Sequence, residues 1–211
     1  WHYAREGELG DLTLNEFGRQ EQIDILCYCN AKYSRVEANV DIINGFHMVR
    51  DPRDIILSAY FSHLHSHPVD AWPALKKQRD LLASIPIKQG LLATLDFLQP
   101  TFEDLDAWNY NSHSIVEVKF EEMIVSCDVF IDVLKKIGLI SNETLNESSA
   151  AEIYRSNSFE NITKGRRPGD INVNSHFRSG LPGEHVHYWF DELDYIFTSR
   201  WGHLLPKLGY Q

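Results

Sequence analysis

The chain has 211 residues, of which 43% are hydrophobic and 24% are charged, and its formal net charge is −10 at pH 7. These values are typical of one globular domain with a substantial core. The acidic balance disfavours general nucleic-acid binding, which needs a basic face, and no apolar run is long enough to span a membrane. The three cysteines are an odd and sparse set rather than a disulfide framework, so we expect a reducing, cytoplasmic location.

The N-terminal part of the sequence predicts alternating strands and helices. We expect residues 1–20 to be loop with one short helix, followed by a strand over 23–29, because this run is compact and apolar. Residues 34–43 have apolar residues at helical spacing behind a capping box, and 46–49 form a second apolar run of strand length. A strand, a helix and a strand in this order predict that the two strands pair in parallel.

The stretch from Gly45 to His63 is the most informative part of the chain. Pro52 suits the first turn of a helix, where its missing N–H costs nothing. Arg50 ends the preceding strand, and Ser58 lies eight residues later, roughly two turns into the helix. A fixed cation, a hydroxyl and a helix N-terminus at the carboxyl end of a parallel strand make an anion site. In the alternative interpretation, the arginines and aspartates of this stretch pair with one another at a surface turn.

Three alternating histidines, His63, His65 and His67, stand at the end of this helix, and Pro68 terminates it. In one interpretation they form a metal site, and in another they are a polar helix end in contact with solvent. In a third, one of them serves in the active site.

The rest of the sequence predicts more helices and one further strand. We expect helices over residues 72–83, 87–97, 101–108, 128–137, 150–154 and 188–205, and a strand over 114–120. Gly138 fits the C-cap of the helix over 128–137. Residues 160–187 have little periodicity and form a long loop, a kind of segment that is often functional in compact domains. The predicted fold class is α/β, with a parallel sheet flanked by helices.

Three segments of the chain resemble motifs of the PAPS-dependent sulfotransferases. Val-Arg-Asp-Pro-Arg-Asp followed by Ser-Ala-Tyr, within residues 49–60, is similar to the family's 3′-phosphate-binding segment. In that family an arginine that ends a strand and a serine eight residues later hold the 3′-phosphate, roles that the resemblance gives to Arg50 and Ser58. Asn157-Ser158-Phe159 resembles the segment whose aromatic ring packs on adenine; the alternative for Phe159 is a core side chain.

The third segment, residues 175–184, resembles the family's Arg-Lys-Gly and Gly-Asp-Trp motif, whose arginine and backbone amides bind the 3′-phosphate. The resemblance places Arg178, Ser179 and Gly180 at that phosphate, where a glycine permits close backbone approach. Ser179 stands where the family has lysine, and Glu184 with His185 stands where it has Asp-Trp. The basic turn at 165–169 either adds positive charge to this site or is solvated surface.

One family motif has no counterpart in the sequence. Nothing in residues 1–22 resembles the phosphosulfate-binding loop Pro-Lys-Ser-Gly-Thr-Thr-Trp, so we expect residues 1–211 to be a single sulfotransferase-like domain without its N-terminal part. The family often uses a histidine as general base, but residues 27–32 hold none where it is expected. His63 and His65, which follow the helix of Ser58, are the fallback candidates, with His63 placed first, and a glutamate or a residue of the missing N-terminal part is the alternative.

The resemblance implies a P-loop nucleotide-kinase-like three-layer architecture and a transferase activity. The chain is then expected to transfer a sulfonyl group from PAPS to a hydroxyl or amine of a small-molecule or glycan acceptor, without a metal. A catalytically inactive nucleotide-binding or protein-interaction module on the same fold is the alternative. A P-loop kinase is disfavoured, because the sequence has no glycine-rich phosphate loop with a following lysine.

Overall fold

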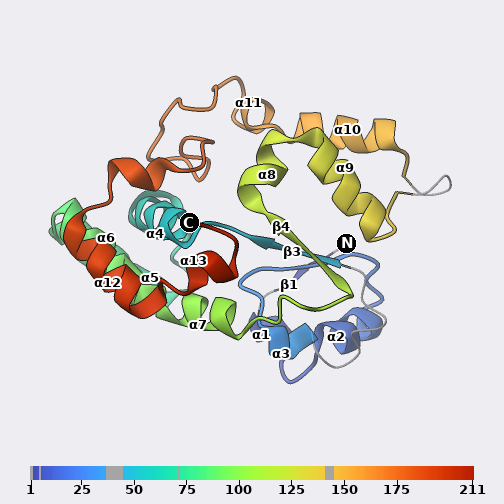
Figure 1. Ribbon diagram of the computed structural model, residues 1–211, viewed down its shortest axis with the longest axis horizontal. Helices are drawn as coiled ribbons and strands as arrows, with labels where there is room; N and C mark the ends of the chain where they lie inside the picture. The colour runs from blue at the N-terminus through green and yellow to red at the C-terminus, as the bar shows by residue number, and fades with distance from the viewer. Residues whose placement is uncertain (1, 5, 37–44, 71, 141–144) are drawn as a thin grey trace.

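The computed structural model describes residues 2–4, 6–36, 45–70, 72–140 and 145–211 (Figure 1). The strands are β1 (His2–Ala4), β2 (Leu26–Tyr28), β3 (Gly45–Val49) and β4 (Ile115–Lys119). The α-helices are α1 (Glu6–Leu9), α2 (Leu14–Gln20), α3 (Tyr33–Val36), α4 (Pro52–Phe61), α5 (Pro73–Ser84), α6 (Ile87–Phe97), α7 (Gln99–Ala107), α8 (Phe120–Val125), α9 (Cys127–Lys136), α10 (Glu147–Ser156), α11 (Phe159–Ile162), α12 (Asp191–Trp201) and α13 (Leu204–Lys207). A π-helical turn, η2 (Ser62–Ser66), follows α4, and a 3₁₀ turn, η3 (Glu184–His187), precedes α12.

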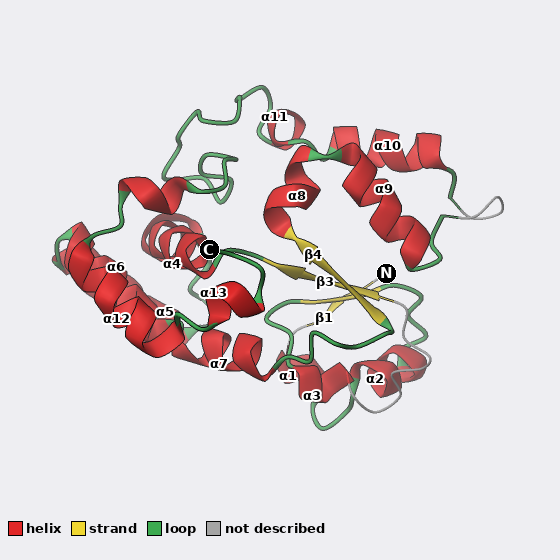
Figure 2. Ribbon diagram, in the orientation of Figure 1, coloured by secondary structure: helices red, strands yellow, loops and turns green. Residues whose placement is uncertain are grey.

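Parallel strand pairs lie at the centre of the molecule, and helices flank them on both sides (Figure 2). β3 pairs with β4 in a register that places His47 opposite Glu117 and Val49 opposite Lys119. β1 pairs in parallel with β2. The predicted α/β class, with parallel strands between helices, is therefore confirmed. None of the described helices is both long enough and apolar enough to cross a membrane.

The predicted partner of the strand before α4 was wrong. The run at 23–29 forms only the three-residue strand β2, which pairs with β1 rather than with β3. β3 instead pairs with β4 over five residues, a longer hydrogen-bonded ladder than the three residues of β2 could form. β1 lies in a segment predicted as loop with one helix, because three residues are too few to show a strand's two-residue period. That segment also holds two short helices rather than one, α1 and α2.

Several other predicted elements are confirmed, with changes at their ends. α4 begins at Pro52 as expected, and Asp51 caps it by accepting a hydrogen bond from the backbone N–H of Arg53. Gly138 follows α9 with φ of +74°, the left-handed conformation that suits glycine at a helix end. The helix predicted over 188–205 is two helices, α12 and α13, which meet near Gly202. Of the helix predicted over 34–43, α3 is described, and positions 37–44 lie outside the described residues.

The largest hydrophobic core joins α4 to helices from the middle and the end of the chain. Its fully or almost fully buried members include Ile56, Leu91, Leu95, Phe102, Leu193 and Phe197. Burial of this apolar surface is the main stabilising contribution. It also fixes α4 against α6 and α12, so the N-terminus of α4 and the loop before α12 have defined places relative to each other.

The packing of α4 on α6 predicts a strong effect at Gly90. A Cβ atom at this position would lie 2.5 Å from Cε2 of Tyr60, so the two helices approach more closely than an alanine allows. We expect Gly90→Ala to lower the free energy of unfolding by about 1–3 kcal/mol in urea denaturation, as overpacked cores do. In the control Gly18→Ala, the new Cβ meets no described atom within 4 Å. This change in α2 should stabilise by up to about 1 kcal/mol through helix propensity. Equal effects of the two substitutions would contradict the close helix contact.

Candidate functional site

A buried carboxylate holds the C-terminal loop against the first turn of α4. Asp54 is 1% exposed. Its Oδ2 accepts from the backbone N–H of Gly183 at 2.5 Å, and its Oδ1 accepts from the backbone N–H of His185 at 3.0 Å and lies 2.8 Å from that residue's Nδ1. Burial raises the pKa of Asp54, but the hydrogen bonds from His185 and Gly183 and the charge of Arg50 outweigh it, and the pKa lies below its ordinary value. The carboxylate therefore stays ionised and keeps the two motifs together.

The two arginines of the motif before α4 lie in different environments. Arg53 pairs with Asp51, as one interpretation predicted: its Nε and Nη2 donate to the carboxylate of Asp51 at 3.0 and 2.7 Å. The predicted surface location is wrong, because Asp51 is buried. Arg50 instead turns inward, and its guanidinium carbon lies 4.8 Å from the ring centroid of Phe120. Its Nε is buried, with no hydrogen-bond partner in the described part of the chain. Burial is the main cause that lowers the pKa of Arg50.

Arg178 reaches the same side of α4 from the C-terminal loop. Its guanidinium carbon lies 4.5 Å from the ring centroid of Phe61, which is one helical turn beyond Ser58. Nη2 donates to Glu184 at 2.6 Å, whereas Nη1 is buried and has no partner among the described residues. The positive charge of Arg178 is also one of the causes that lower the pKa of Arg50, so the structure places two cationic groups near each other.

Gly180 and Phe159 are in direct contact beside Arg178. Gly180 has φ of +70°, and a Cβ atom there would lie 2.4 Å from Cδ2 of Phe159. Phe159 is only half-buried and packs on this glycine, so the core alternative for its ring is not what the structure shows. Ser179 is 4% exposed, and its hydroxyl donates to the carboxylate of Glu184 rather than pointing outward.

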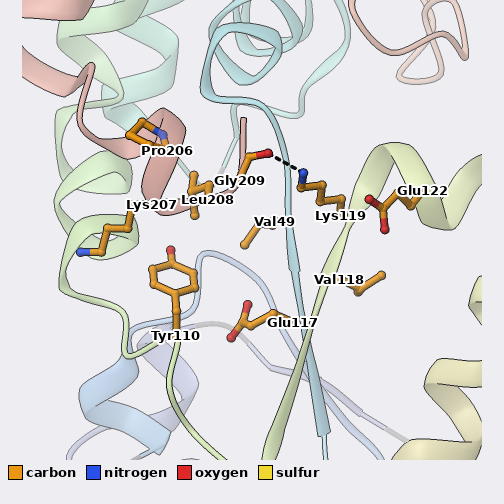
Figure 3. Close-up of a pocket in the computed structure, with 10 residues that line it drawn as sticks. All are labelled: Val49, Tyr110, Glu117, Val118, Lys119, Glu122, Pro206, Lys207, Leu208 and Gly209. Atoms are coloured by element: carbon orange, nitrogen blue, oxygen red, sulfur yellow. Dashed lines mark hydrogen bonds between the residues drawn. The ribbon is translucent and has the colours of Figure 1, made fainter. Parts of the chain in front are cut away.

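Glu121 connects the start of α4 to the C-terminal tail. It accepts from the backbone N–H of Asp51 at 3.1 Å and from the hydroxyl of Tyr210 at 2.6 Å. The tail is also held by Lys119, whose Nζ donates to the carbonyl of Gly209 at 2.6 Å (Figure 3). Burial and Glu121 raise the pKa of Tyr210. A cavity of about 390 Å³ lies under this tail, lined by Val49, Tyr110, Glu117, Val118, Lys119, Glu122, Pro206, Lys207, Leu208 and Gly209.

His63, the candidate base, lies in η2 among aromatic rings. It is 6% exposed, and its ring centroid is 5.2 Å from that of Phe97 and 6.0 Å from that of Trp72. Burial lowers the pKa of His63 to about 4, and the charges of His67 and Arg79 contribute in the same direction. The imidazole is therefore neutral at pH 7, and its buried Nδ1 has no partner in the described structure.

The other histidines of this run point in different directions. His65 is exposed and stacks on Phe61, with ring centroids 6.4 Å apart, and His67 lies 6.3 Å from His176 of the C-terminal loop. Among the residues that the structure describes, no three histidine, cysteine or acidic side chains are grouped as metal ligands. The alternation in sequence does not give one face, because η2 is helical rather than extended.

The structure brings most of the predicted site residues into one region beside α4: Arg50, Phe159, Arg178, Ser179 and Gly180. Ser58 lies on α4 one helical turn before Phe61, the residue that Arg178 contacts. His63 lies a turn further along, and its ring contacts are aromatic side chains and His67. Sequence reasoning missed Asp54 and its partner His185, which no local pattern marks as a pair.

The comparisons with known proteins concern the fold. No family model matches the sequence, and no curated protein matches it. Among solved structures, mouse sulfotransferase SULT7A1 complexed with PAP is similar, with a TM-score of 0.58 and 17% sequence identity, over 90% of this chain and 68% of that chain. The chain has the α/β fold of a sulfotransferase. Two expectations from the sequence stay predictions: that residues 1–211 form a single domain, and that this domain lacks the phosphosulfate-binding loop.

The contacts of Asp54 predict a large effect of a small substitution. In Asp54→Asn, the new amide group would direct its N–H bonds at a backbone N–H of Gly183 or His185, so one acceptor is lost. We expect the free energy of unfolding to fall by about 1–3 kcal/mol at pH 7. Because its folded-state pKa is lowered, Asp54 stabilises the protein above its unfolded pKa of about 3.9, and this contribution is lost as pH falls through the folded value.

Chemical denaturation between pH 7 and pH 2 measures both effects. Asp80→Asn, on the exposed side of α5, is the matched control and should leave the stability within about 0.5 kcal/mol. Identical stability profiles of Asp54→Asn and wild type would show that the loop is held in another way.

The burial of His63 predicts a loss of stability in mild acid. The unfolded chain binds a proton near pH 6.5, whereas the folded chain does so only near pH 4, so acidification between these values favours unfolding. The contribution of His63 over this range is about 3 kcal/mol. We expect His63→Phe, which keeps an aromatic ring, to reduce the pH dependence of the unfolding free energy between pH 6.5 and pH 4. The exposed control His113→Phe should retain it.

Proposed function

We propose that this chain is a PAPS-dependent sulfotransferase whose nucleotide 3′-phosphate binds between α4 and the C-terminal loop. The main support is a pair of arginines with unsatisfied hydrogen-bond donors. Arg50 and Arg178 come from distant parts of the chain and lie near each other, and each has a buried guanidinium nitrogen without a partner among the described residues. A buried donor on a charged group is costly to leave unsatisfied, and phosphate oxygens are acceptors that match a guanidinium group.

The surroundings of the two arginines support a nucleotide rather than a simple anion. Ser58 offers a hydroxyl on the same side of α4, and the half-buried ring of Phe159 lies next to Gly180. We propose that Arg50, Ser58 and Arg178 bind the 3′-phosphate, that the backbone at Ser179 and Gly180 donates to it, and that Phe159 contacts adenine. The fold neighbour is complexed with PAP, the nucleotide product that such a reaction releases.

In the proposed reaction, an acceptor oxygen or nitrogen attacks the sulfur of PAPS while the bond from sulfur to the nucleotide phosphate oxygen breaks. The acceptor's proton passes to a general base, and the nucleotide leaves as adenosine 3′,5′-bisphosphate. His63 stays the candidate base, since its imidazole is neutral at pH 7. Its burial lowers the pKa to about 4 and so weakens it as a base, and an acceptor would have to reach it among the aromatic rings. With this activity we propose a small-molecule or glycan acceptor and a reducing, cytoplasmic location.

The proposed location is supported by the three cysteines, which are free thiols.

Titration calorimetry with adenosine 3′,5′-bisphosphate, and with adenosine 5′-monophosphate for comparison, tests the nucleotide site. We expect the bisphosphate to bind more tightly, because only it carries the 3′-phosphate. Arg50→Ala should weaken bisphosphate binding by about 2–3 kcal/mol and Ser58→Ala by about 1 kcal/mol, with little change for the monophosphate.

Arg53→Ala is the matched control for Arg50→Ala. Arg53 belongs to the same motif, but its guanidinium is already paired with Asp51, so the preference for the bisphosphate should persist. If wild type does not distinguish the two nucleotides, or if Arg50→Ala leaves the preference intact, the site is misassigned.

A second candidate function is a nucleotide-binding module without transferase activity. It is favoured by Ser179, which replaces the family's lysine and whose hydroxyl is directed to Glu184. The two candidates differ in turnover of PAPS. Release of the bisphosphate that depends on an added hydroxyl or amine acceptor indicates the transferase, whereas tight binding without release indicates the module.

A further inference from the structure

A third arginine of this region, Arg166, is neither a free cation nor a solvated surface group. It lies in the basic turn at 165–169, is half-buried, and turns back onto its own loop. Its Nη1 donates to the carbonyls of Asp170 and Arg178, at 3.0 and 3.1 Å. Its Nη2 donates to the hydroxyl of Ser175 at 3.1 Å and to the carbonyl of Phe177 at 2.5 Å.

These contacts use all of the terminal donors of Arg166. A guanidinium group has four N–H bonds on its two terminal nitrogens, and here each of them has an acceptor within the loop. Arg178 and Arg50 differ, because each has a buried nitrogen without a described partner. Arg166 therefore organises the loop, and the other two arginines are the ones with donors left for a ligand.

The hydrogen bonds of Arg166 set the orientation of two consecutive peptide groups. In a trans peptide the C=O and the N–H point in opposite directions. When Arg166 holds the carbonyls of Phe177 and Arg178, it turns the N–H groups of Arg178 and Ser179 to the other side of the loop. In the described structure these two N–H groups, and that of Gly180, donate to no protein group. Adjacent free N–H groups of this kind form an anion-binding concavity.

Arg166 also contacts the aromatic ring of the site. Its guanidinium carbon lies 5.1 Å from the ring centroid of Phe159, and that ring packs on Gly180. Two further hydrogen bonds hold the backbone of residues 178–179: the N–H of Gly169, in the basic turn, donates to the carbonyl of Ser179, and the N–H of Asn172, just after the turn, donates to the carbonyl of Arg178. One side chain thus touches both the proposed adenine contact and the proposed phosphate-binding backbone.

We propose that Arg166 is a positioning residue for the nucleotide site. It directs the backbone N–H groups of Arg178 and Ser179 at the 3′-phosphate and holds Phe159 against Gly180, without itself contacting the nucleotide. This proposal rests on the proposed nucleotide-binding function. A lysine cannot replace Arg166, since a single ammonium group does not reach four acceptors arranged around a planar fork.

The test compares Arg166→Lys with Arg167→Lys, a conservative change in the exposed neighbouring arginine. Titration calorimetry with adenosine 3′,5′-bisphosphate and adenosine 5′-monophosphate gives the affinity ratio of the two nucleotides for each protein. We expect Arg166→Lys to lower this ratio about tenfold or more, as loss of charge-assisted hydrogen bonds does, and Arg167→Lys to leave it unchanged. A purely structural role would lower both affinities together and preserve the ratio.

A second variant guards against a failure of Arg166→Lys to fold. Ser175→Ala removes one acceptor of the Arg166 fork and should lower the same ratio by a smaller factor, on the order of threefold, with a normal thermal unfolding transition. If wild type prefers the bisphosphate and neither variant changes the ratio, the role of Arg166 is overturned while the nucleotide site stands. If wild type has no preference, the proposed function itself fails.

Discussion

The carboxylate of Asp54 is the contact on which the site depends. It is buried at the first turn of α4, and its three polar contacts all come from residues 183–185 of the C-terminal loop. Together with the contact of Arg178 on Phe61, it sets the position of the C-terminal loop relative to α4. A carboxylate can serve here because the partial positive charge of a helix N-terminus and the N–H donors compensate its burial.

Two arginines lie near each other in the site because carboxylates surround them. These carboxylates offset the positive charges but do not accept hydrogen bonds from all of the guanidinium nitrogens. Arg50 experiences the negative charges of Asp54, Glu121 and Glu184, and Arg178 bonds directly to Glu184. These groups oppose the repulsion between the guanidinium ions before any ligand arrives. The pairing is incomplete, because each arginine has a buried nitrogen without a hydrogen-bond partner among the described residues, and these donors are the basis of the proposed phosphate site.

Sequence reasoning found the parts of this structure that short segments determine. Pro52, Arg50 and Ser58 could be placed because a strand, a proline turn and a helix are encoded within about twenty residues, and Gly138 because a helix end needs a left-handed residue. The Asp54 contact, the Tyr210 bond to Glu121 and the fork of Arg166 could not be predicted. Each depends on which distant or irregular backbone comes near, and a three-residue strand such as β1 has too little pattern to be seen.

The separation of these partners along the chain has a consequence for folding. Asp51 meets Glu121 across 70 residues, and Asp54 meets His185 across 131 residues. Contacts of such range require closure of long loops and form after local helices and turns have already appeared. Arg50 and Ser58 lie within one strand and the helix that follows it, whereas the complete candidate site needs these long-range contacts. If the proposed function holds, nucleotide binding requires the native topology of the whole polypeptide, and a bound nucleotide would stabilise that topology as a unit.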